Sequence, residues 1–348
     1  MHPLKTDHPT ILIAPDSFKG SLSAAAVATA IGDALAPLLP QAHLILLPLA
    51  DGGEGTAAVL QTACGGSWHL IGVQGPLGDP VQARVLKLRD PSVAVVELAQ
   101  ASGLLLCDHR DPLRTSTYGT GEMIRAALEL ESEELWIALG GSATVDGGAG
   151  LAQALGYRFL DQHGHSIGHG GGALLKLAHI EPPAKKLPLP AKICGLCDVH
   201  APLLGPTGAA QVFGPQKGAT PEQVVILEQG LALLAQIIQR DLGRDVTGIP
   251  GAWAAGGAGA GLVGFLGATL VSGSSIVQEA IGLDRQLAQA DLLITGEGSL
   301  DRQSLMGKGV GALIQKAQAL HVPTLVVAGQ VNPTLAEELQ RQGIASAS

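Results

Sequence analysis

The sequence predicts an α/β protein in which both ends of the chain form one doubly wound parallel sheet and the middle forms a second, inserted α/β domain. Short apolar runs at residues 11–14 and 44–47 have the length of buried strands, and a polar loop follows each of them. Val27, Ile31 and Leu35 then recur at helical spacing after the first loop. Strands that alternate with helices in this way are typical of a parallel sheet.

The end of the chain repeats the pattern of its beginning. Apolar runs at residues 292–295 and 322–328 are separated by a glycine-rich polar loop and a helical stretch. We therefore expect residues 1–65 and 285–348 to form one discontinuous domain, and residues 66–284 to form the inserted domain.

The middle of the chain has a different pattern of predicted helices and strands. Residues 81–88 and 93–98 predict two short strands, and residues 221–242 predict a long helix. Residues 251–261 are almost wholly alanine and glycine. Such small side chains predict a place where backbones approach each other very closely.

Composition limits the classes of function. The 348 residues include 48 glycines but only 3% aromatic residues, which suits a protein with many tight turns. The net charge is −9 and no basic block occurs, so we expect no nucleic-acid partner. No apolar run is long enough for a bilayer, and the apolar run near the N-terminus is too short for a signal peptide. These features predict a cytoplasmic protein without a membrane partner.

Cysteine and histidine patterns suggest two metal sites that we do not favour. Cys194 and Cys197 form a C-x-x-C motif, but it lies in an apolar run and no second such motif accompanies it. We expect both thiols to be reduced and free of metal. His163, His165 and His169 lie in a polar loop without a carboxylate or cysteine at ligand spacing, so a solvated loop is the favoured interpretation.

The stretch from residue 136 to residue 156 has the pattern of a ligand-binding turn. Four apolar residues predict a buried strand, residues 140–148 form a glycine-rich turn, and apolar residues at helical spacing follow. Backbone N–H groups in such a turn can hold an anion, which makes Gly141 and Ser142 candidate binding residues. Asp146 would repel an anion unless a cation or a hydroxyl lay between them. A purely structural turn explains the same pattern, and both interpretations stay open.

Charged residues are few, yet they recur in the loops that follow apolar strands. Charged residues make up only 15% of the chain. Those in strand-end loops are Asp16, Lys19, Asp51, Glu54, Asp146, Asp198, Lys217, Glu297, Asp301 and Lys308. Carboxylates mixed with lysines at such places suit metal-assisted phosphoryl transfer, because lysines neutralise phosphate and carboxylates hold Mg²⁺.

Several common motifs are missing. Gly307-Lys308 lacks the remaining residues of a phosphate-binding P-loop, and no G-x-G-x-x-G follows the first strand. No G-x-S-x-G nucleophile elbow is present, which argues against a serine hydrolase. Two alternatives to a phosphotransferase remain: an NAD-dependent oxidoreductase of small hydroxy acids, and a non-catalytic sensor of small acids.

Seven segments of the chain resemble the signatures of the bacterial glycerate kinase family. In order they are PDSFKGSLSA (15–24), ADGGEGT (50–56), RDPLRTSTYGTGE (110–122), GGSATVDGGAG (140–150), CDVHAPL (197–203), FGPQKGA (213–219) and TGEGSLDRQSLMGK (295–308). The resemblance implies ATP-dependent phosphorylation of D-glycerate, usually at the 2-hydroxyl. It also implies a Rossmann- or flavodoxin-like domain with an inserted α/β domain. The family usually has Thr-Asn in place of His200-Ala201, and Arg in place of Ser299.

These observations together give a hypothesis for the role of each residue, with ATP and Mg²⁺ as the implied co-substrate and metal. The phosphoryl group passes directly from ATP to the acceptor, and either Asp198 or Asp51 is the base. Lys19 and Lys217 are further candidate catalytic residues that contact phosphate or carboxylate. Candidate Mg²⁺ ligands are Glu54, Glu297 and Asp301. Candidate contacts to substrate or nucleotide are Asp16, Ser17, Gly141, Ser142, Asp146, Gly296 and Lys308.

Overall fold

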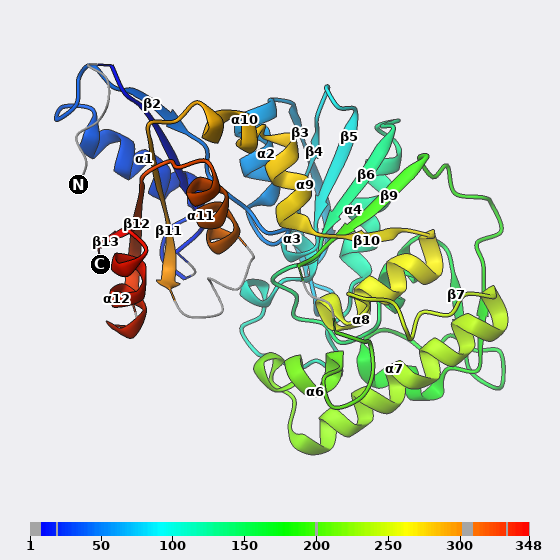
Figure 1. The fold of residues 1–348 in the computed structure, drawn as a ribbon. Helices are drawn as coiled ribbons and strands as arrows, with labels where there is room; N and C mark the ends of the chain where they lie inside the picture. Colours follow the sequence, from blue (N-terminus) through cyan, green and yellow to red (C-terminus); the bar gives the residue numbers. More distant parts are fainter. Residues whose placement is uncertain (1–7, 19, 199–200, 301–308, 332, 348) are drawn as a thin grey trace. The chain divides into compact units, whose positions relative to one another are not determined.

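The structure is a computed structural model that describes residues 8–18, 20–198, 201–300, 309–331 and 333–347. Helices and strands alternate along most of the chain, and the predicted α/β class is confirmed (Figure 1). No helix in these described ranges is both long and apolar enough to cross a membrane.

The chain divides into two compact units. Unit 1 comprises Met1–Asp51, Ala58–Cys64 and Ser274–Ser348, and unit 2 comprises Gly52–Ala57 and Gly65–Gly273. Each unit has its own central sheet. The domain boundaries expected from the sequence stay a prediction.

Unit 1 is built on a five-stranded parallel sheet with the order β13-β12-β11-β1-β2. Its strands are β1 (Thr10–Pro15), β2 (His43–Leu46), β11 (Leu292–Leu300), β12 (Thr324–Val331) and β13 (Ala345–Ala347). Ile11 lies beside Leu292 in the register, so the expected pairing of the first strand with a strand near the chain end is confirmed. Five of the six residues of β1 are buried, as expected for a central parallel strand covered on both faces.

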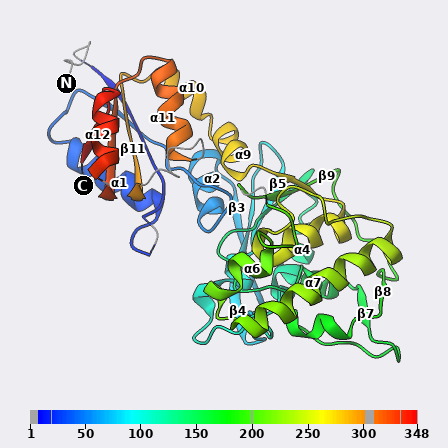
Figure 2. The same cartoon turned by 60° about the horizontal axis from the view of Figure 1, so that its bottom comes forward.

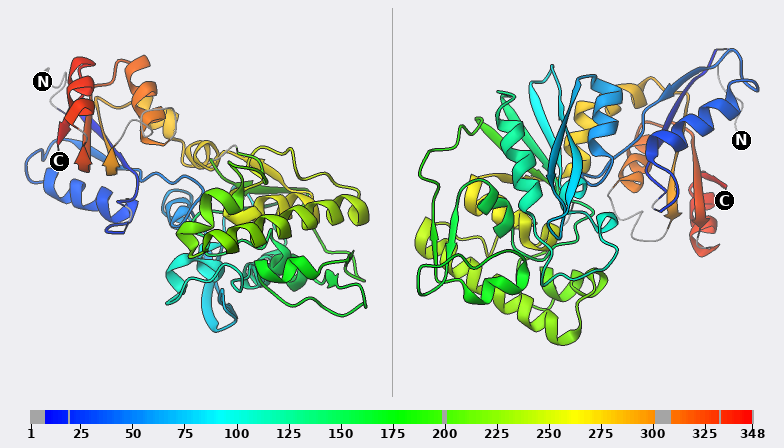
Figure 3. Two further views of the ribbon diagram at one scale, coloured as in Figure 1. Left: turned by 90° about the horizontal axis from the view of Figure 1, so that it is seen from below. Right: turned by 180° about the vertical axis from the view of Figure 1, so that it is seen from behind.

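Helices cover both faces of the unit 1 sheet. The helices of unit 1 are α1 (Ala24–Leu35), most of α2 (Thr56–Cys64), α9 (Gly273–Ala280), α10 (Leu283–Ala288), α11 (Val310–Ala319) and α12 (Pro333–Arg341). Figure 3 shows α1 on one face of the sheet and α11 with α12 on the other. The chain passes from β1 to β2 on one side, whereas β11 leads to β12 and β13 on the other. The order therefore reverses between β1 and β11, which is the switch point where such sheets bind ligands.

Unit 2 contains a six-stranded mixed sheet with the order β10-β9-β6-β5-β4-β3, and a separate two-stranded antiparallel sheet. The large sheet comprises β3 (Ser67–Gln74), β4 (Pro80–Lys87), β5 (Val93–Glu97), β6 (Glu134–Ala138), β9 (Lys192–Leu196) and β10 (Thr269–Val271). The small sheet comprises β7 (Arg158–Leu160) and β8 (His179–Glu181). Strands β5, β6, β9 and β10 run parallel, while β3 and β4 are antiparallel.

The helices of unit 2 are short apart from α7. They are α3 (Ala99–Ser102), α4 (Tyr118–Leu128), α5 (Ala149–Ala154), α6 (Ala209–Phe213), α7 (Pro221–Leu242) and α8 (Ala254–Gly261). Single turns complete the set: η1 (Leu104–Leu106), η2 (Gly171–Lys176), η3 (Pro215–Lys217) and the π-helical η4 (Leu262–Leu266). Helix α6 lies against α7 (Figure 2).

Helix α7 begins and ends where its sequence predicts. The Thr220 side chain accepts a hydrogen bond from the Gln223 N–H, the Gln223 side chain bonds back to the cap, and Pro221 occupies the first turn. Gly243 ends the helix at φ 70°, a left-handed conformation that suits glycine. The capped ends and a buried leucine-rich face together confirm the predicted helix over residues 221–242.

The alanine- and glycine-rich stretch packs directly on the glycine-rich turn, residues 140–148. A Cβ atom added to Gly256 would collide with the Thr144 carbonyl, and one added to Gly261 would lie 2.5 Å from the Gly147 carbonyl oxygen. Gly256 also has φ 67°. The prediction of very close backbone packing at residues 251–261 is therefore confirmed.

Two local predictions, a strand that ends at residue 295 and a polar loop at residues 213–219, were wrong, and one strand was missed. The strand near the chain end does not stop at residue 295 but continues as β11 to Leu300, with Ser299 opposite Gln330. Its glycines fit a strand because a Cβ on Gly296 would collide with the Val327 carbonyl of the neighbouring strand. The segment at residues 213–219 is mostly helical, and β3 was not predicted at all.

Candidate active site

Four neighbouring parallel strands end at one edge of unit 2. These are β5, β6, β9 and β10, and we call their carboxyl ends, with the loops that follow, the carboxyl edge of unit 2. Glu97 ends β5, the glycine-rich turn follows β6, and Asp198 comes shortly after β9. Since parallel strands all end on the same side, these residues lie along one edge.

The loop at residues 52–55 packs onto this edge through glycine backbones. The Gly140 N–H donates to the Gly52 carbonyl at 3.3 Å, and a Cβ on Gly140 would lie 2.5 Å from the Gly53 Cα. A Cβ on Gly52 would lie 3.0 Å from the Leu196 backbone oxygen. Side chains at these glycines would push the loop off the sheet, so the glycines bring the loop to the carboxyl edge of unit 2.

The packed loop places Glu54, a predicted Mg²⁺ ligand, next to Gly141. A Cβ on Gly141 would lie 3.9 Å from the Glu54 Oε2 atom, and both residues are exposed. The structure therefore brings together two of the residues that the sequence singled out, one carboxylate and one turn residue.

Two backbone hydrogen bonds hold the glycine-rich turn, and two of its N–H groups are not used in them. The Leu104 N–H donates to the Gly141 carbonyl at 2.9 Å, and the Ala143 N–H donates to the Ser102 carbonyl at 2.8 Å. Within the described ranges, the N–H groups of Gly141 and Ser142 have no hydrogen-bond acceptor. Gly141 has φ 79° and is exposed. Successive N–H groups around a left-handed residue can form a concavity that binds anions.

Asp146 is fully enclosed in the same turn, with 0% of its surface exposed. Its carboxylate accepts four hydrogen bonds, from the Thr117 N–H, the Thr117 hydroxyl, the Gly148 N–H and the Gly150 N–H, at 2.8 to 3.3 Å. Burial raises the pKa of this carboxyl group, and the four donors oppose that rise. In this structure Asp146 fastens the turn to the start of α4, and its proposed contact with a ligand stays a prediction.

Lys217 contacts the glycine-rich turn, and only 3% of its surface is exposed. Its Nζ donates to the Ser142 hydroxyl at 2.7 Å and to the Thr144 carbonyl at 2.8 Å. Burial lowers the pKa of the amine to about 7, and the charge of Asp146 partly opposes that shift. The structure thus joins Lys217 to Ser142 by a hydrogen bond and brings the amine within electrostatic reach of Asp146, while the expected contact of Lys217 with a phosphate or carboxylate stays untested.

Asp198 lies at the carboxyl edge of unit 2 and is half-buried. The Ser272 hydroxyl, which follows β10, donates to its Oδ1 atom at 2.7 Å. This bond fixes the carboxylate at a strand end while leaving it partly accessible. Such a position suits a general base, provided that the acceptor hydroxyl binds within hydrogen-bond reach.

Glu97 is a buried carboxylate that the sequence analysis missed. It is 5% exposed and accepts hydrogen bonds from the Ala57 N–H at 2.8 Å and the Gln100 side chain at 2.7 Å. Burial raises its pKa, and the charge of Glu54 adds to the rise. Its bond to Ala57 satisfies an N–H at the start of α2. The sequence held a signal for this residue, because Glu97 directly follows four apolar residues of a buried strand. A carboxylate buried at such a place needs hydrogen-bond partners.

Four candidates from unit 1 lie at the carboxyl edge of its own sheet, near the switch point. The Asp16 N–H donates to the Gly296 carbonyl at 2.8 Å, and the Ser17 N–H donates to Asp16 Oδ1 at 2.6 Å. Glu297 lies in β11 and is half-buried. Their positions match where a doubly wound sheet binds ligands.

Asp51, the second candidate base, belongs to unit 1. The Leu49 N–H donates to the Pro15 carbonyl at 2.8 Å, so the chain leaves the sheet of unit 1 beside the end of β1. Asp51 follows two residues later and is half-buried. Three further candidates, Lys19, Asp301 and Lys308, lie outside the described residues.

The cysteine and histidine candidates show no cluster of metal ligands in the described part of the chain. Cys194 is buried in β9, where desolvation raises the pKa of its thiol. Two of the loop histidines, His163 and His165, donate their backbone N–H groups to the Asp161 carboxylate. The expectation that Cys194 and Cys197 are free of metal stays a prediction.

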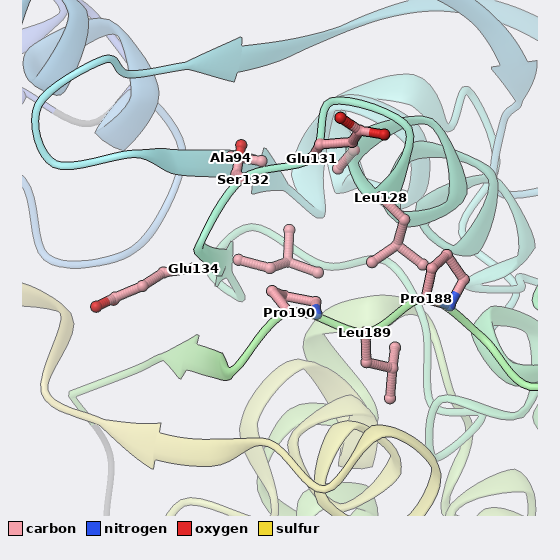
Figure 4. A pocket seen from close by; sticks show the side chains of 10 residues that line it. Ala94, Leu128, Glu131, Ser132, Glu134, Pro188, Leu189 and Pro190 are labelled. Carbon is pink, nitrogen blue, oxygen red and sulfur yellow. The ribbon is translucent and has the colours of Figure 1, made fainter.

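A cavity of about 310 Å³ lies at the opposite end of the unit 2 strands (Figure 4). Its walls are mainly apolar, with Leu128, Leu135 and Leu189 among them. The Glu134 carboxylate extends away from it, and Trp136 and Lys192 bind that carboxylate. Since no candidate catalytic residue lines this cavity, the carboxyl edge remains the candidate active site.

Comparison with known proteins identifies the family. A family model described as the glycerate kinase family matches residues 11–348. The chain belongs to the glycerate kinase family. A glycerate kinase from Halalkalibacterium halodurans is 45% identical over 329 residues, which cover 92% of this chain and 86% of the relative. The glycerate 2-kinase of Escherichia coli is 44% identical over 326 residues, with 92% and 85% covered.

A solved structure extends the likeness within the glycerate kinase family to the fold. The crystal structure of a Salmonella typhimurium LT2 protein assigned as glycerate kinase 2 matches with a TM-score of 0.81 at 42% sequence identity. The match covers 97% of this chain and 94% of that chain.

Proposed function

We propose that this protein transfers the γ-phosphoryl group of ATP to a hydroxyl group of D-glycerate. The observation that carries the proposal is the carboxyl edge of unit 2, where two N–H groups without acceptors among the described residues lie beside the exposed Glu54 carboxylate, on the same edge as Asp198. Phosphoryl transfer needs an anion site, a cation site and a base. Relatives named glycerate kinase support the choice of substrate.

The Gly141 and Ser142 N–H groups bind a phosphate or carboxylate oxygen in this proposal. Two adjacent N–H donors act as a fixed partial positive charge that needs no rearrangement during the reaction. The fixed orientation follows from two bonds, one from the Leu104 N–H to the Gly141 carbonyl and one from the Ala143 N–H to the Ser102 carbonyl. We therefore expect this part of the turn to have the same shape before and after the ligand binds.

Glu54 is the proposed Mg²⁺ ligand in unit 2. Its carboxylate is exposed beside the N–H groups of the turn, and oxygen ligands of this kind fit Mg²⁺. The ion would neutralise charge on the transferred phosphoryl group when bound. Glu54 next to an anion site would otherwise repel the ligand, so the donor set itself favours a cation there.

Asp198 is the proposed base. A glycerate hydroxyl attacks the γ-phosphorus, a new oxygen–phosphorus bond forms, and the bond to the oxygen that bridges the β- and γ-phosphates breaks. The hydroxyl proton passes to the Asp198 carboxylate, and ADP leaves with the bridging oxygen. The Ser272 hydroxyl orients the carboxylate for this step. Asp51, at the carboxyl edge of unit 1, is the alternative base.

The carboxyl edge of unit 1 supports further binding roles. Asp16 and Gly296 are joined by a backbone hydrogen bond at the switch point, and Glu297 follows in β11. We propose that Asp16 and Ser17 contact substrate or nucleotide and that Glu297 is a second candidate Mg²⁺ ligand. Phosphorylation at the 2-hydroxyl is the favoured product, supported by the relative named glycerate 2-kinase.

A coupled assay of ADP release tests the function. The purified protein is incubated with MgATP and a panel of small hydroxy acids, and phosphorus NMR identifies the product. We expect ADP release that depends on D-glycerate and a 2-phosphoglycerate signal. ADP release without glycerate dependence would contradict the proposal. Oxidation of glycerate with NAD⁺, or binding of glycerate without turnover, would instead support one of the alternatives that the family relationship disfavours.

A further inference from the structure

The least expected feature of unit 2 is an amine buried behind the glycine-rich turn. Lys217 Nζ, the Ser142 hydroxyl and the Thr144 carbonyl form a closed triangle, because Ser142 Oγ also lies 3.4 Å from the Thr144 oxygen. Lys217 reaches this triangle from the 3₁₀ turn η3, which lies more than seventy residues further along the chain. The lysine therefore joins two distant segments at the turn.

A buried lysine is a poor choice for stability alone. Desolvation of an ammonium group is expensive, and no acidic side chain among the described residues makes an ion pair with Lys217. An apolar side chain of similar volume is often neutral or stabilising at such a place. The hydrogen bonds to Ser142 and Thr144 are thus the distinctive contribution of the amine.

The residue that the amine holds is also the residue that offers an N–H group. The Ser142 side chain accepts from Lys217, while the Ser142 backbone and Gly141 carry the N–H groups without acceptors in the described ranges. Within the described part of the chain, loss of the amine would leave the Ser142 hydroxyl and the Thr144 carbonyl with only the 3.4 Å hydrogen bond between them. The turn would then keep its backbone hydrogen bonds to Ser102 and Leu104 but lose its two hydrogen bonds to the Lys217 amine.

We propose that Lys217 is a positioning residue for phosphoryl transfer, which holds Ser142 so that the Gly141 and Ser142 N–H groups keep the geometry that binds the anion. Lys217 acts through Ser142 and does not touch the ligand. This inference rests on the proposed function, since it gives the turn a ligand. It differs from a direct contact of the lysine with phosphate, because both observed bonds of the amine are made to the protein.

A double-mutant cycle tests the positioning role. The variants are Lys217→Met, which has similar length without donors, Ser142→Ala, and the two combined. We expect each single variant to lower kcat about 10- to 100-fold with a smaller change in KM, because the N–H groups stabilise charge that develops in the transition state. The double variant should be no worse than either single one, since both remove the same contact. Additive losses would overturn the inference and indicate a separate ligand contact of Lys217.

Hydrogen exchange provides a readout that does not depend on activity. The Ala143 N–H is bound to the Ser102 carbonyl, and we expect it to exchange faster in both single variants of the ligand-free protein. Lys192→Met is the matched control, because this lysine pairs with Glu134 at the opposite end of the strands. It should leave both kcat and exchange at Ala143 unchanged.

The outcomes separate this inference from the proposed function. If the wild-type protein releases no ADP with glycerate, the proposed function fails, while exchange at Ala143 still reports on the contact. If the wild type is active and Ser142→Ala is fully active, only the positioning role fails. Should Lys217→Met not fold, Ser142→Ala alone decides, since it keeps the lysine and removes the contact.

Discussion

Charged residues at the glycine-rich turn of unit 2 are more deeply buried than those beside the strands of unit 1. In unit 2, the buried Asp146 and Lys217 make hydrogen bonds to the protein, while Asp198 is half-buried. In unit 1, Asp16 after β1 and Glu297 within β11 are half-buried. A charged residue in a glycine-rich loop can therefore build the loop or face a ligand. Proximity to a strand end does not distinguish the two.

The largest expected effect concerns the base. Asp198→Asn keeps the shape and the bond to Ser272 but cannot accept a proton, so kcat should fall roughly 10²- to 10⁴-fold. KM for ATP and glycerate should stay near normal in steady-state assays. Asp161→Asn, in an exposed loop, is the control. If Asp198→Asn is fully active and Asp51→Asn is inactive at every Mg²⁺ concentration, the base belongs to unit 1 instead.

The second prediction compares the stability lost when a buried or a half-buried aspartate is removed. Asp146→Ala leaves four buried donors without an acceptor and should lower the free energy of unfolding by about 3 kcal/mol or more. Asp16→Ala removes a half-buried carboxylate and should lower it by about 1 kcal/mol or less. Urea unfolding of both variants provides the comparison. Equal losses would show that the contrast between the two edges is false.

The dependence of activity on Mg²⁺ concentration tests which of the two units holds the metal. Glu54→Gln should lower activity about 10-fold at low Mg²⁺, corresponding to about 1.4 kcal/mol, and raised Mg²⁺ should restore much of it by mass action. Glu297→Gln is measured in parallel, with the exposed Glu222→Gln as control. Rescue of Glu297→Gln alone would assign the metal to the carboxyl edge of unit 1.

A separate prediction concerns the dependence of stability on pH. The pKa of Lys217 is about 7 in the folded protein, against 10.5 ordinarily, so between these values only the unfolded chain holds the proton. Stability should therefore rise with pH across that window, by up to ~1.4 kcal/mol per pH unit, and stay flat below it. Lys217→Met should lack this component in urea unfolding from pH 6 to pH 10. Parallel curves for the two proteins would contradict it.

The sequence was sufficient for elements with local signals. Helix α7 needed only its cap residues and its apolar face, and the strand before the glycine-rich turn needed only four apolar residues. Strand β3 was missed because it is a largely half-exposed edge strand in which apolar and polar residues do not alternate strictly. The continuation of β11 was missed because its glycines resemble a turn, and only the neighbouring β12 reveals a strand.

The sequence predicted that candidate residues lie at strand ends, but not which way their side chains point. The strand-end positions of Gly141 and Asp198 followed from apolar runs and the polar loops beside them. Glu54 was expected in the domain of residues 1–65, whereas residues 52–57 belong to unit 2. The inward direction of Lys217 depends on Ser142 and Thr144, and the burial of Asp146 depends on Thr117. Those partners lie far away in the sequence, and no local pattern encodes the contact.

The interleaved glycines also set an order of events during synthesis. The backbone of the glycine-rich turn meets Gly256, Gly257 and Gly261, which leave the ribosome more than a hundred residues later. Contacts between such distant segments form late, because the long intervening loop must first be closed. A nascent chain that ends before residue 251 therefore lacks the surface on which residues 144–148 pack. We expect this half of the turn to reach its packed form only after almost the whole of unit 2 has been made.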